Sequence, residues 1–224
     1  MIGILCGLQS EKKIVSKIPN SIVLCSGSNP DVGRNLALEL VDRGVDFLMS
    51  FGVAGALSPD LSAGDIVVGK KVVSSYASWE CDSVTAQRLL LVLPRTRLVS
   101  VYGSENLVSS PAAKNKIYSA TGCHIVDMES QCVAQIACQY SIPFIVVRAV
   151  CDDAETRLPS SVTKSVRTDG SVDVMQSVKN ILAEPKDIFR VMSLAINMKK
   201  ATSSLYGVCK SMLASKNMFM LSRR

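Results

Sequence analysis

Short apolar, β-branched segments alternate with helical patterns along most of this 224-residue chain, and this alternation limits the fold more than any other feature. Strands that alternate with helices form a mainly parallel sheet with helices on its faces. We therefore predict an α/β protein, with strands at 2–6, 21–25, 46–50, 65–74, 97–102, 124–127 and 142–150. The predicted helices are 31–43, 111–120, 129–140 and 172–183, and Ser110 and Pro111 mark the start of the second as N-cap and first helical position.

The composition is that of one globular domain, with 48% hydrophobic and 20% charged residues. The net charge of +6 comes entirely from residues 191–224, which hold six basic residues and no acid: Lys199, Lys200, Lys210, Lys216, Arg223 and Arg224. Residues 1–190 are balanced, so a nucleic-acid-binding surface on the body is not expected. We expect a main domain at 1–190, followed by a basic, apolar helical extension at 191–224.

The cysteines and the N-terminus bear on metal binding and location. The eight cysteines form no Cys-x-x-Cys pair and His124 is the single histidine, so neither a metal nor a cofactor is expected. No window approaches the roughly 18 consecutive apolar residues of a membrane span. The apolar run at 2–6 follows no basic stretch, which is unlike a secretory signal. These features predict a cytoplasmic protein.

Acidic and glycine residues follow several predicted strands. Glu11 follows strand 2–6, Glu129 follows 124–127 and Asp152 follows 142–150, and a glycine turn after 46–50 consists of Gly52, Val53, Ala54 and Gly55. Ligands of open parallel sheets bind at the carboxyl ends of the strands, where these features would meet. Each also has a structural interpretation: Glu11 in the first turn of a helix, Glu129 and Asp152 as caps, and Arg148 as a paired charge. Together, on one sheet edge, they favour a site.

Three stretches resemble the purine nucleoside phosphorylase and nucleosidase superfamily, and in particular its methylthioadenosine/S-adenosylhomocysteine nucleosidases. They are VDMESQCVAQIACQYSIPFIVVRAVCDDAE, MSFGVAGALSPDLSAGDIVVG and IGILCGLQSE. The resemblance spans about residues 1–156 and implies a three-layer αβα sandwich with a mixed, mainly parallel sheet. The stretches SSPAAKNKIYSATGCHIVDMES and LPSSVTKSVRTDGSVDVMQSVKNILAEPKDIFRVMSLAINMKKATSSL resemble the hopanoid-associated phosphorylases, or adenosylhopane nucleosidases. That group is assigned the removal of adenine from adenosylhopane to give ribosylhopane.

The resemblance implies a role for each candidate residue. Glu11 would activate water, Glu129 would hold the ribose hydroxyls with Met128 against the sugar, and Asp152 would protonate the purine. Gly52, Val53, Ala54 and Gly55 would shape the floor of the ribosyl site. Cleavage of an N-glycosidic bond passes through an oxocarbenium-like state, and acids and carboxylates at these places fit that chemistry.

The chain departs from the family pattern at several positions. Cys151 replaces the Ser that hydrogen-bonds the acid, and Leu107 falls where nucleosidases place an aromatic residue on adenine. Ser50 and Val53 replace the Arg and Ser with which phosphorylases hold phosphate, which favours hydrolysis. Alternatives are a methylthioadenosine/S-adenosylhomocysteine nucleosidase, a purine nucleoside phosphorylase, or a non-catalytic nucleoside-binding protein.

The C-terminal stretch 203–221 places apolar residues at helical spacing among basic ones: Leu205, Val208, Cys209, Met212 and Leu213. Two interpretations are equally open. The helix could pack on its own domain or on a second copy, or residues 203–224 could contact an anionic membrane that holds a lipid substrate. The expected partners are an adenosyl-containing small molecule or lipid and, from the resemblance, a second copy in a homodimer.

Overall fold

A computed structural model describes residues 1–159 and 188–215. Its strands are β1 (Ile2–Cys6), β2 (Ser21–Cys25), β3 (Phe47–Ala56), β4 (Ile66–Val73), β5 (Ser78–Glu80), β6 (Arg97–Gly103), β7 (Ile125–Asp127) and β8 (Phe144–Asp152). Its helices are α1 (Gln9–Val15), α2 (Pro30–Asp42), α3 (Ser83–Val92), α4 (Pro111–Thr121), α5 (Ser130–Gln139) and α8 (Ile188–Ala214). The predicted helix at 172–183 lies outside the described residues.

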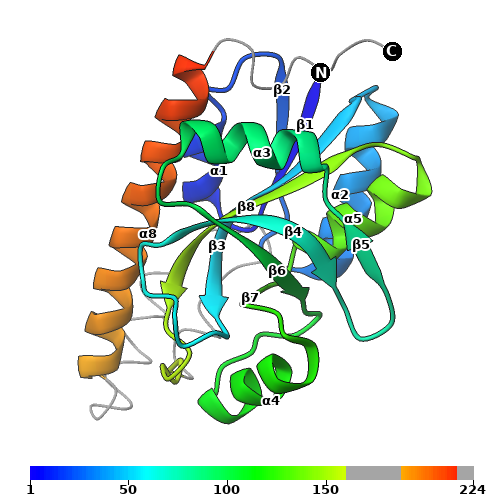
Figure 1. The fold of residues 1–224 in the computed structure, drawn as a ribbon. Helices are drawn as coiled ribbons and strands as arrows, with labels where there is room; N and C mark the ends of the chain where they lie inside the picture. Colours follow the sequence, from blue (N-terminus) through cyan, green and yellow to red (C-terminus); the bar gives the residue numbers. More distant parts are fainter. Residues whose placement is uncertain (160–187, 216–224) are drawn as a thin grey trace.

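The eight strands form one mixed sheet in which parallel pairing predominates. Part of the sheet closes on itself, because β3 pairs with β8, β8 with β4, β4 with β6, β6 with β7, and β7 again with β3. Strands β1 and β2 extend the sheet from β3, and β5 extends it from β4. Helices α1 and α8 lie on one side and α2 and α5 on the other (Figure 1). The predicted α/β sandwich is confirmed.

Strand β3 is longer than the sequence predicts. The segment of Gly52, Val53, Ala54 and Gly55 is not a turn but the second half of β3, which remains paired with β8. A Cβ at Gly52 would lie 2.7 Å from Nη1 of Arg148, and a Cβ at Gly55 would lie 3.1 Å from Oδ2 of Asp152. The glycines therefore make room for side chains of neighbouring elements rather than for a change of chain direction.

Helix α4 begins and ends as the sequence predicts. The Ser110 hydroxyl accepts a hydrogen bond from the Ala113 amide at 3.3 Å, and Pro111 occupies the first turn. Gly122 ends the helix with a φ of 66°, a left-handed conformation that glycine adopts without strain. These caps fix the register of α4, and the register decides which side chains the helix turns toward β8.

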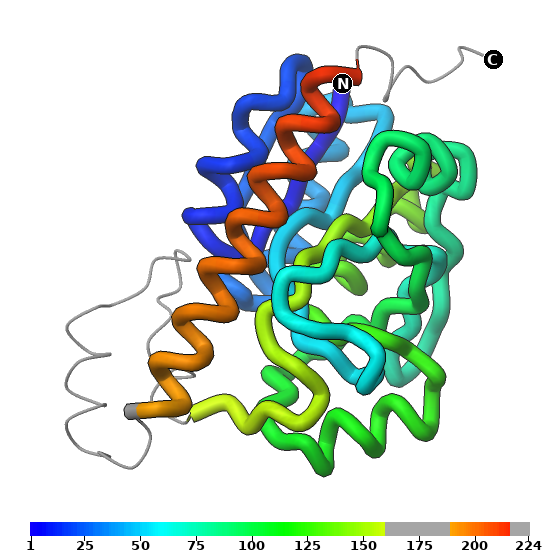
Figure 2. Tube along the Cα trace, turned by 60° about the vertical axis from the view of Figure 1, so that its left-hand side comes forward, coloured from blue at the N-terminus to red at the C-terminus, as the bar shows by residue number. Residues whose placement is uncertain are grey.

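Helix α8 packs against the domain along much of its length and lies beside α1 in two views (Figures 1 and 2). The side chains of Leu205, Val208, Cys209 and Met212 are all buried in the main core. These four side chains therefore pack on the domain and do not face a membrane, whereas Leu213 is 40% exposed and residues 216–224 lie outside the described residues. No helix within residues 1–159 and 188–215 is long and apolar enough to cross a membrane.

Because side chains of α8 are buried, replacing one of them with alanine should lower the stability of the protein. Leu205→Ala removes a fully buried side chain, and we expect the free energy of unfolding to fall by about 2–5 kcal/mol. Leu213→Ala on the same helix, where the side chain is 40% exposed, should cost about 0.5 kcal/mol or less. Urea unfolding of both variants measures the difference, and equal losses would contradict this placement of α8.

Candidate active site

The carboxylate of Glu11 joins the start of α1 to strand β3. Its Oε2 accepts hydrogen bonds from the amides of Gly7 at 3.0 Å and Leu8 at 2.9 Å, and its Oε1 accepts one from the Val53 amide at 2.8 Å. Burial raises the pKa of Glu11, although Arg148 and these amides oppose the shift. A buried carboxyl with a raised pKa is better matched to taking a proton near neutral pH than an exposed one.

Arg148 lies at the middle of β8, is completely buried, and links the acidic residues of the site. Its Nε donates to Asp127 at 2.7 Å and its Nη2 donates to Ser50 Oγ at 2.6 Å, while Nη2 lies 3.5 Å from Glu129 Oε2. Its Nη1 has no hydrogen-bond partner among the described residues. The interpretation as a paired charge is confirmed, and Nη1 is a buried donor that has no acceptor among the described residues.

Glu129 occupies the N-cap position of α5, but its side chain does not cap the helix. Asp127 does so instead, accepting from the amides of Glu129 at 3.1 Å and Ser130 at 2.8 Å. The Glu129 carboxylate therefore makes no cap hydrogen bond and instead accepts a hydrogen bond on Oε1 from Ser26 Oγ at 3.3 Å. Burial raises the pKa of Glu129 to about 7; Arg148 opposes this, and Asp127 and Glu11 add to it.

The shift at Glu129 predicts a pH-dependent stability. The unfolded chain releases the Glu129 proton near pH 4.5 and the folded chain only near pH 7, so the free energy of unfolding falls as the pH rises between these values. At about 1.4 kcal/mol per pKa unit, the loss is about 3 kcal/mol. Glu129→Gln has no such proton to lose. Urea unfolding at pH 4.5 and 7.5 should show a smaller decline in the variant, and parallel declines would contradict the assignment.

Gly52 brings Glu11 and Arg148 to one point of the site. A Cβ at position 52 would lie 2.7 Å from both Glu11 Oε1 and Arg148 Nη1. A carboxylate oxygen that accepts and a guanidinium edge that donates thus flank a strand segment without a side chain. A water molecule or a sugar hydroxyl can donate a hydrogen bond to a carboxylate and accept one from a guanidinium. The structure thus places a hydrogen-bond acceptor, and a donor that lacks an acceptor within the described part of the chain, at one buried point beside β3.

Asp152 is the last residue of β8 and lies beside Gly55. Its Oδ1 accepts from the Cys151 thiol at 3.2 Å, and its Oδ2 is in contact with the ammonium of Lys114. A small cavity contains Asp152 together with residues from four segments, namely Gly55, Asn106, Leu107, Val108, Val126, Asp127, Met128 and Leu158. The cavity has a volume of about 40 Å³, and its lining combines apolar side chains with the carboxyl groups of Asp127 and Asp152.

The structure brings the predicted residues into two adjoining clusters. Glu11, Gly52, Val53 and Glu129 surround Arg148, whereas Gly55, Met128 and Asp152 line the small cavity. Ala54 contributes its carbonyl, which accepts from the Cys151 thiol at 3.4 Å. Asp127 joins the clusters, because it lines the cavity and pairs with Arg148.

Several site residues escaped the sequence analysis. Ser26 and Lys114 were not identified, Asp127 was given no specific role, and Arg148 was assigned a structural role alone. A basic residue within an otherwise apolar buried strand was a usable signal for Arg148. Lys114 gave none, because lysines are common on exposed helix faces.

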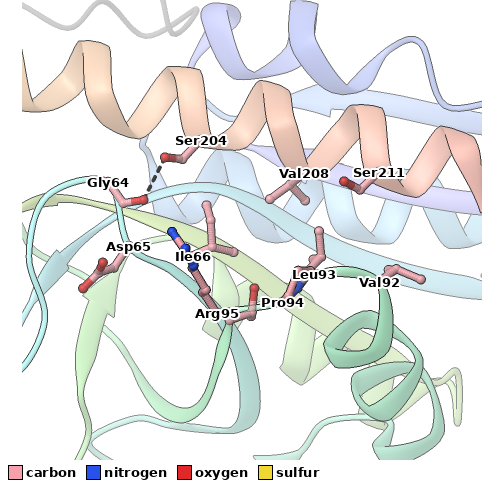
Figure 3. A pocket seen from close by; sticks show the side chains of 11 residues that line it. Gly64, Asp65, Ile66, Val92, Leu93, Pro94, Arg95, Ser204, Val208 and Ser211 are labelled. Carbon is pink, nitrogen blue, oxygen red and sulfur yellow. Dashed lines mark hydrogen bonds between the residues drawn. The ribbon is translucent and has the colours of Figure 1, made fainter.

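A larger groove of about 380 Å³ lies elsewhere, between α8 and the segments at 64–66 and 92–96 (Figure 3). Ser204 donates to the Gly64 carbonyl at 2.8 Å across it, and none of the predicted site residues lines it. Within the described part of the chain, no group of three or more His, Cys, Asp or Glu side chains is arranged to hold a metal ion. The buried ionisable side chains of the candidate site include those of Glu11, Glu129, Arg148 and Asp152.

Comparison with known proteins finds a relative among the nucleosidases. The 5′-methylthioadenosine/S-adenosylhomocysteine nucleosidase of Staphylococcus aureus (strain bovine RF122 / ET3-1) is 25% identical over 129 residues, which cover 48% of this chain and 57% of the nucleosidase. The matched part thus spans little more than half the length of that relative.

Two solved structures share the fold over nearly the whole chain. Futalosine hydrolase of Helicobacter pylori strain 26695 superimposes with a TM-score of 0.71 at 17% identity, covering 95% of this chain and 97% of the hydrolase. The S. pneumoniae 5′-methylthioadenosine/S-adenosylhomocysteine nucleosidase, solved with a transition-state inhibitor, gives 0.68 at 18% identity and covers 94% and 99%. The sequence pattern of the phosphorylase superfamily matches residues 20–183. The chain belongs to the phosphorylase superfamily.

Proposed function

We propose that this chain is a nucleosidase, which hydrolyses the N-glycosidic bond of an adenosyl compound and releases adenine. The observation that carries the proposal is the pair of Glu11 Oε1 and Arg148 Nη1 on either side of Gly52, with Glu129 alongside and Asp152 in the adjoining cavity. The similar proteins described above are named as nucleosidases or hydrolases, which supports the same chemistry.

Each residue then has one task. Glu129 accepts hydrogen bonds from the ribose hydroxyls, and its charge stabilises the cationic sugar as the bond breaks. Arg148 Nη1 orients a water molecule and Glu11 takes its proton as it attacks the anomeric carbon. Asp152 delivers a proton to the departing purine, which would otherwise leave as an anion.

The surroundings favour water over phosphate as the nucleophile. The Ser50 hydroxyl is engaged by Arg148 at 2.6 Å, and Val53 has no hydroxyl to offer. The carboxylates of Glu11 and Glu129 would repel a phosphate dianion, and Arg148 already neutralises Asp127. A water molecule carries no charge and avoids this repulsion.

Adenosylhopane is the substrate we propose within this class. Leu107 lines the cavity in place of an aromatic residue, so binding of the base alone is expected to be weak. The exposed side chains of Phe189, Met192 and Ile196 lie on the first turns of α8. Figures 1 and 2 both place these turns near the carboxyl ends of β3 and β8, where an apolar group on the ribose could be covered.

The test compares adenine release from adenosylhopane in detergent micelles, 5′-methylthioadenosine and S-adenosylhomocysteine. We expect kcat/KM for adenosylhopane to exceed the others by about tenfold or more, the effect of roughly 1.4 kcal/mol of extra apolar contact. Met192→Ser should remove part of this preference and leave methylthioadenosine cleavage unchanged. Equal rates would overturn the lipid specificity alone. Absence of adenine from all three substrates would overturn the nucleosidase assignment.

We also propose that the chain is a homodimer, in keeping with its family resemblance. Light scattering during size-exclusion chromatography should give a mass near twice the 24.1 kDa of one chain. A single-chain mass at micromolar concentration would contradict this.

A further inference from the structure

Lys114 is the one lysine among the described residues whose side chain is completely buried. It belongs to the first turn of α4, and the neighbouring positions 115 and 116 on that helix are exposed. An ammonium group loses its hydration when it is buried, so a lysine persists in such a place only with charged or polar partners. The groups around the Lys114 ammonium therefore indicate the role of this residue.

The ammonium of Lys114 has two partners, one in the last residue of β8 and one in the residue directly after it. It contacts Oδ2 of Asp152 and donates to the Asp153 carbonyl at 2.6 Å. The side chain of Asp152 is itself only 4% exposed. The pair thus joins α4 to the carboxyl group that the proposed reaction uses, from the side away from solvent.

An ionised Asp152 lacks the proton that the reaction requires. Both of its oxygens are acceptors here, Oδ1 from the Cys151 thiol at 3.2 Å and Oδ2 from Lys114. Burial raises the pKa of the Cys151 thiol well above its usual value, and the adjacent Asp152 carboxylate adds to this, so the thiol holds its proton tightly. Of the two donors, the ammonium is the charged one and the natural proton source.

We propose that Lys114 is a positioning residue and the proton source for Asp152, so that adenine leaves on a proton that originates from the Lys114 ammonium. The proposal rests on the proposed nucleosidase function. One N–H bond of Lys114 breaks as an O–H bond forms on Asp152. That O–H bond then breaks as N7 of the purine gains the proton and the glycosidic electron pair passes into the ring.

The proton count closes over one turnover. Water gives hydroxide to the anomeric carbon and a proton to Glu11, and adenine carries away the proton that Asp152 received from Lys114. Lys114 is then a neutral amine and Glu11 a neutral acid. Exchange with solvent after product release returns one proton to Lys114 and removes one from Glu11. No oxidant, metal or further reactant is needed.

The test separates this role from a purely structural one by the choice of leaving group. Adenine needs a proton to leave, whereas 4-nitrophenolate does not. The full chain, its Lys114→Met variant and the control Lys116→Met are assayed with 5′-methylthioadenosine and with 4-nitrophenyl β-D-ribofuranoside. Lys116 lies on the same helix and is exposed. Melting temperatures of all three proteins are recorded.

We expect Lys114→Met to lower kcat for methylthioadenosine by about 10²-fold with KM changed less than about threefold, as for loss of a proton donor. Cleavage of the nitrophenyl riboside should change less than about threefold, and Lys116→Met should match the wild type. An equal loss on both substrates would overturn the proposal, as would an unchanged kcat. Adenine release by the wild type verifies the underlying nucleosidase function independently.

A second comparison keeps the test decisive if Lys114→Met unfolds readily. Asp152→Asn removes the acceptor through which Lys114 acts, and the double variant Lys114→Met/Asp152→Asn has no buried charge left unpaired in the pair. The double variant should release adenine as slowly as Asp152→Asn alone, within about threefold, because residues that act in series are not additive. A further loss of tenfold or more would overturn the proposal.

Discussion

Asp152→Asn should lower the turnover number for an adenosyl substrate by about 10²-fold or more, the usual effect of losing a general acid. The amide retains the shape of the side chain and an oxygen that accepts from Lys114, but it has no acidic proton for the departing purine. Substrate affinity should weaken much less, since an amide N–H still donates to the ring nitrogen. Steady-state kinetics of adenine release give both parameters.

The neighbouring Asp153 is the matched control. Its Oδ1 accepts from the Ala63 amide at 2.9 Å, so this carboxylate is directed away from the cavity toward the segment before β4. Asp153→Asn should leave the turnover number within about threefold of the wild type, because that hydrogen bond is retained by an amide oxygen. The reverse ranking of the two variants would mean that the other aspartate is the acid.

Glu11→Gln should lower turnover by about 10²–10⁴-fold, because the amide cannot take the proton of the attacking water. It should also lower stability. Both carboxylate oxygens accept from backbone amides, Oε2 from Gly7 and Leu8 and Oε1 from Val53. A glutamine turns an NH₂ group toward one set of these donors, and leaving buried amides without an acceptor costs about 1–3 kcal/mol.

Glu80→Gln is the control for Glu11, since Glu80 is exposed on β5. It should change neither kcat nor the urea midpoint. The two effects at Glu11 are separable: a loss of stability without a loss of turnover would leave Glu11 as a structural link between α1 and β3 and would remove it from the reaction.

The elements that the sequence predicted well are those whose signals are local. Ser110, Pro111 and Gly122 define α4 through caps that depend on adjacent residues alone. Asp82 capped α3 in the same way, accepting from the Thr85 amide at 2.7 Å, but α3 was not predicted. The apolar residues of α3 form a continuous run and do not follow the spacing of one helix face, so the hydrophobic periodicity did not indicate a helix.

The pairing between strands that are distant in sequence could not be predicted from such local signals. Residues 52–55 resemble a turn because they contain two glycines. Each glycine instead leaves room for a side chain from another element, Arg148 at Gly52 and Asp152 at Gly55. Closure of β3 through β7 and β8 depends on residues that are more than 60 positions apart in sequence. A short-range pattern carries no information about such neighbours.

In the candidate site, too, some residues could be predicted from local sequence, and others depend on contacts that are distant in sequence. Asp152 ends β8, and Glu11 and Glu129 belong to the starts of the helices that follow β1 and β7, which is where the general rule for parallel sheets places ligand-binding residues. Lys114 comes from the first turn of a helix, and only the three-dimensional structure turns its ammonium inward onto Asp152. The apolar stripe of α8 was likewise visible in the sequence, but whether it packs on protein or lipid depends on the partner surface.

The site carries more negative than positive side chains around its central cation. Glu11, Asp127 and Glu129 all face Arg148, and the pKa of Glu129 is raised to about 7 by burial, against the attraction of Arg148. One carboxyl group of this cluster is therefore protonated over part of the neutral range. Binding of a ribose, whose hydroxyls donate to carboxylates, should favour the ionised form of Glu129.

The identity of the sugar product tests the central claim most directly. The purified protein is incubated with adenosylhopane or 5′-methylthioadenosine in phosphate-free buffer and in the same buffer with added phosphate, and the products are identified by mass spectrometry. We predict adenine and the free ribosyl sugar in equal amounts, at a rate that phosphate does not raise. Adenine release that requires phosphate and yields a ribosyl 1-phosphate would contradict the account, as would the absence of adenine from both substrates.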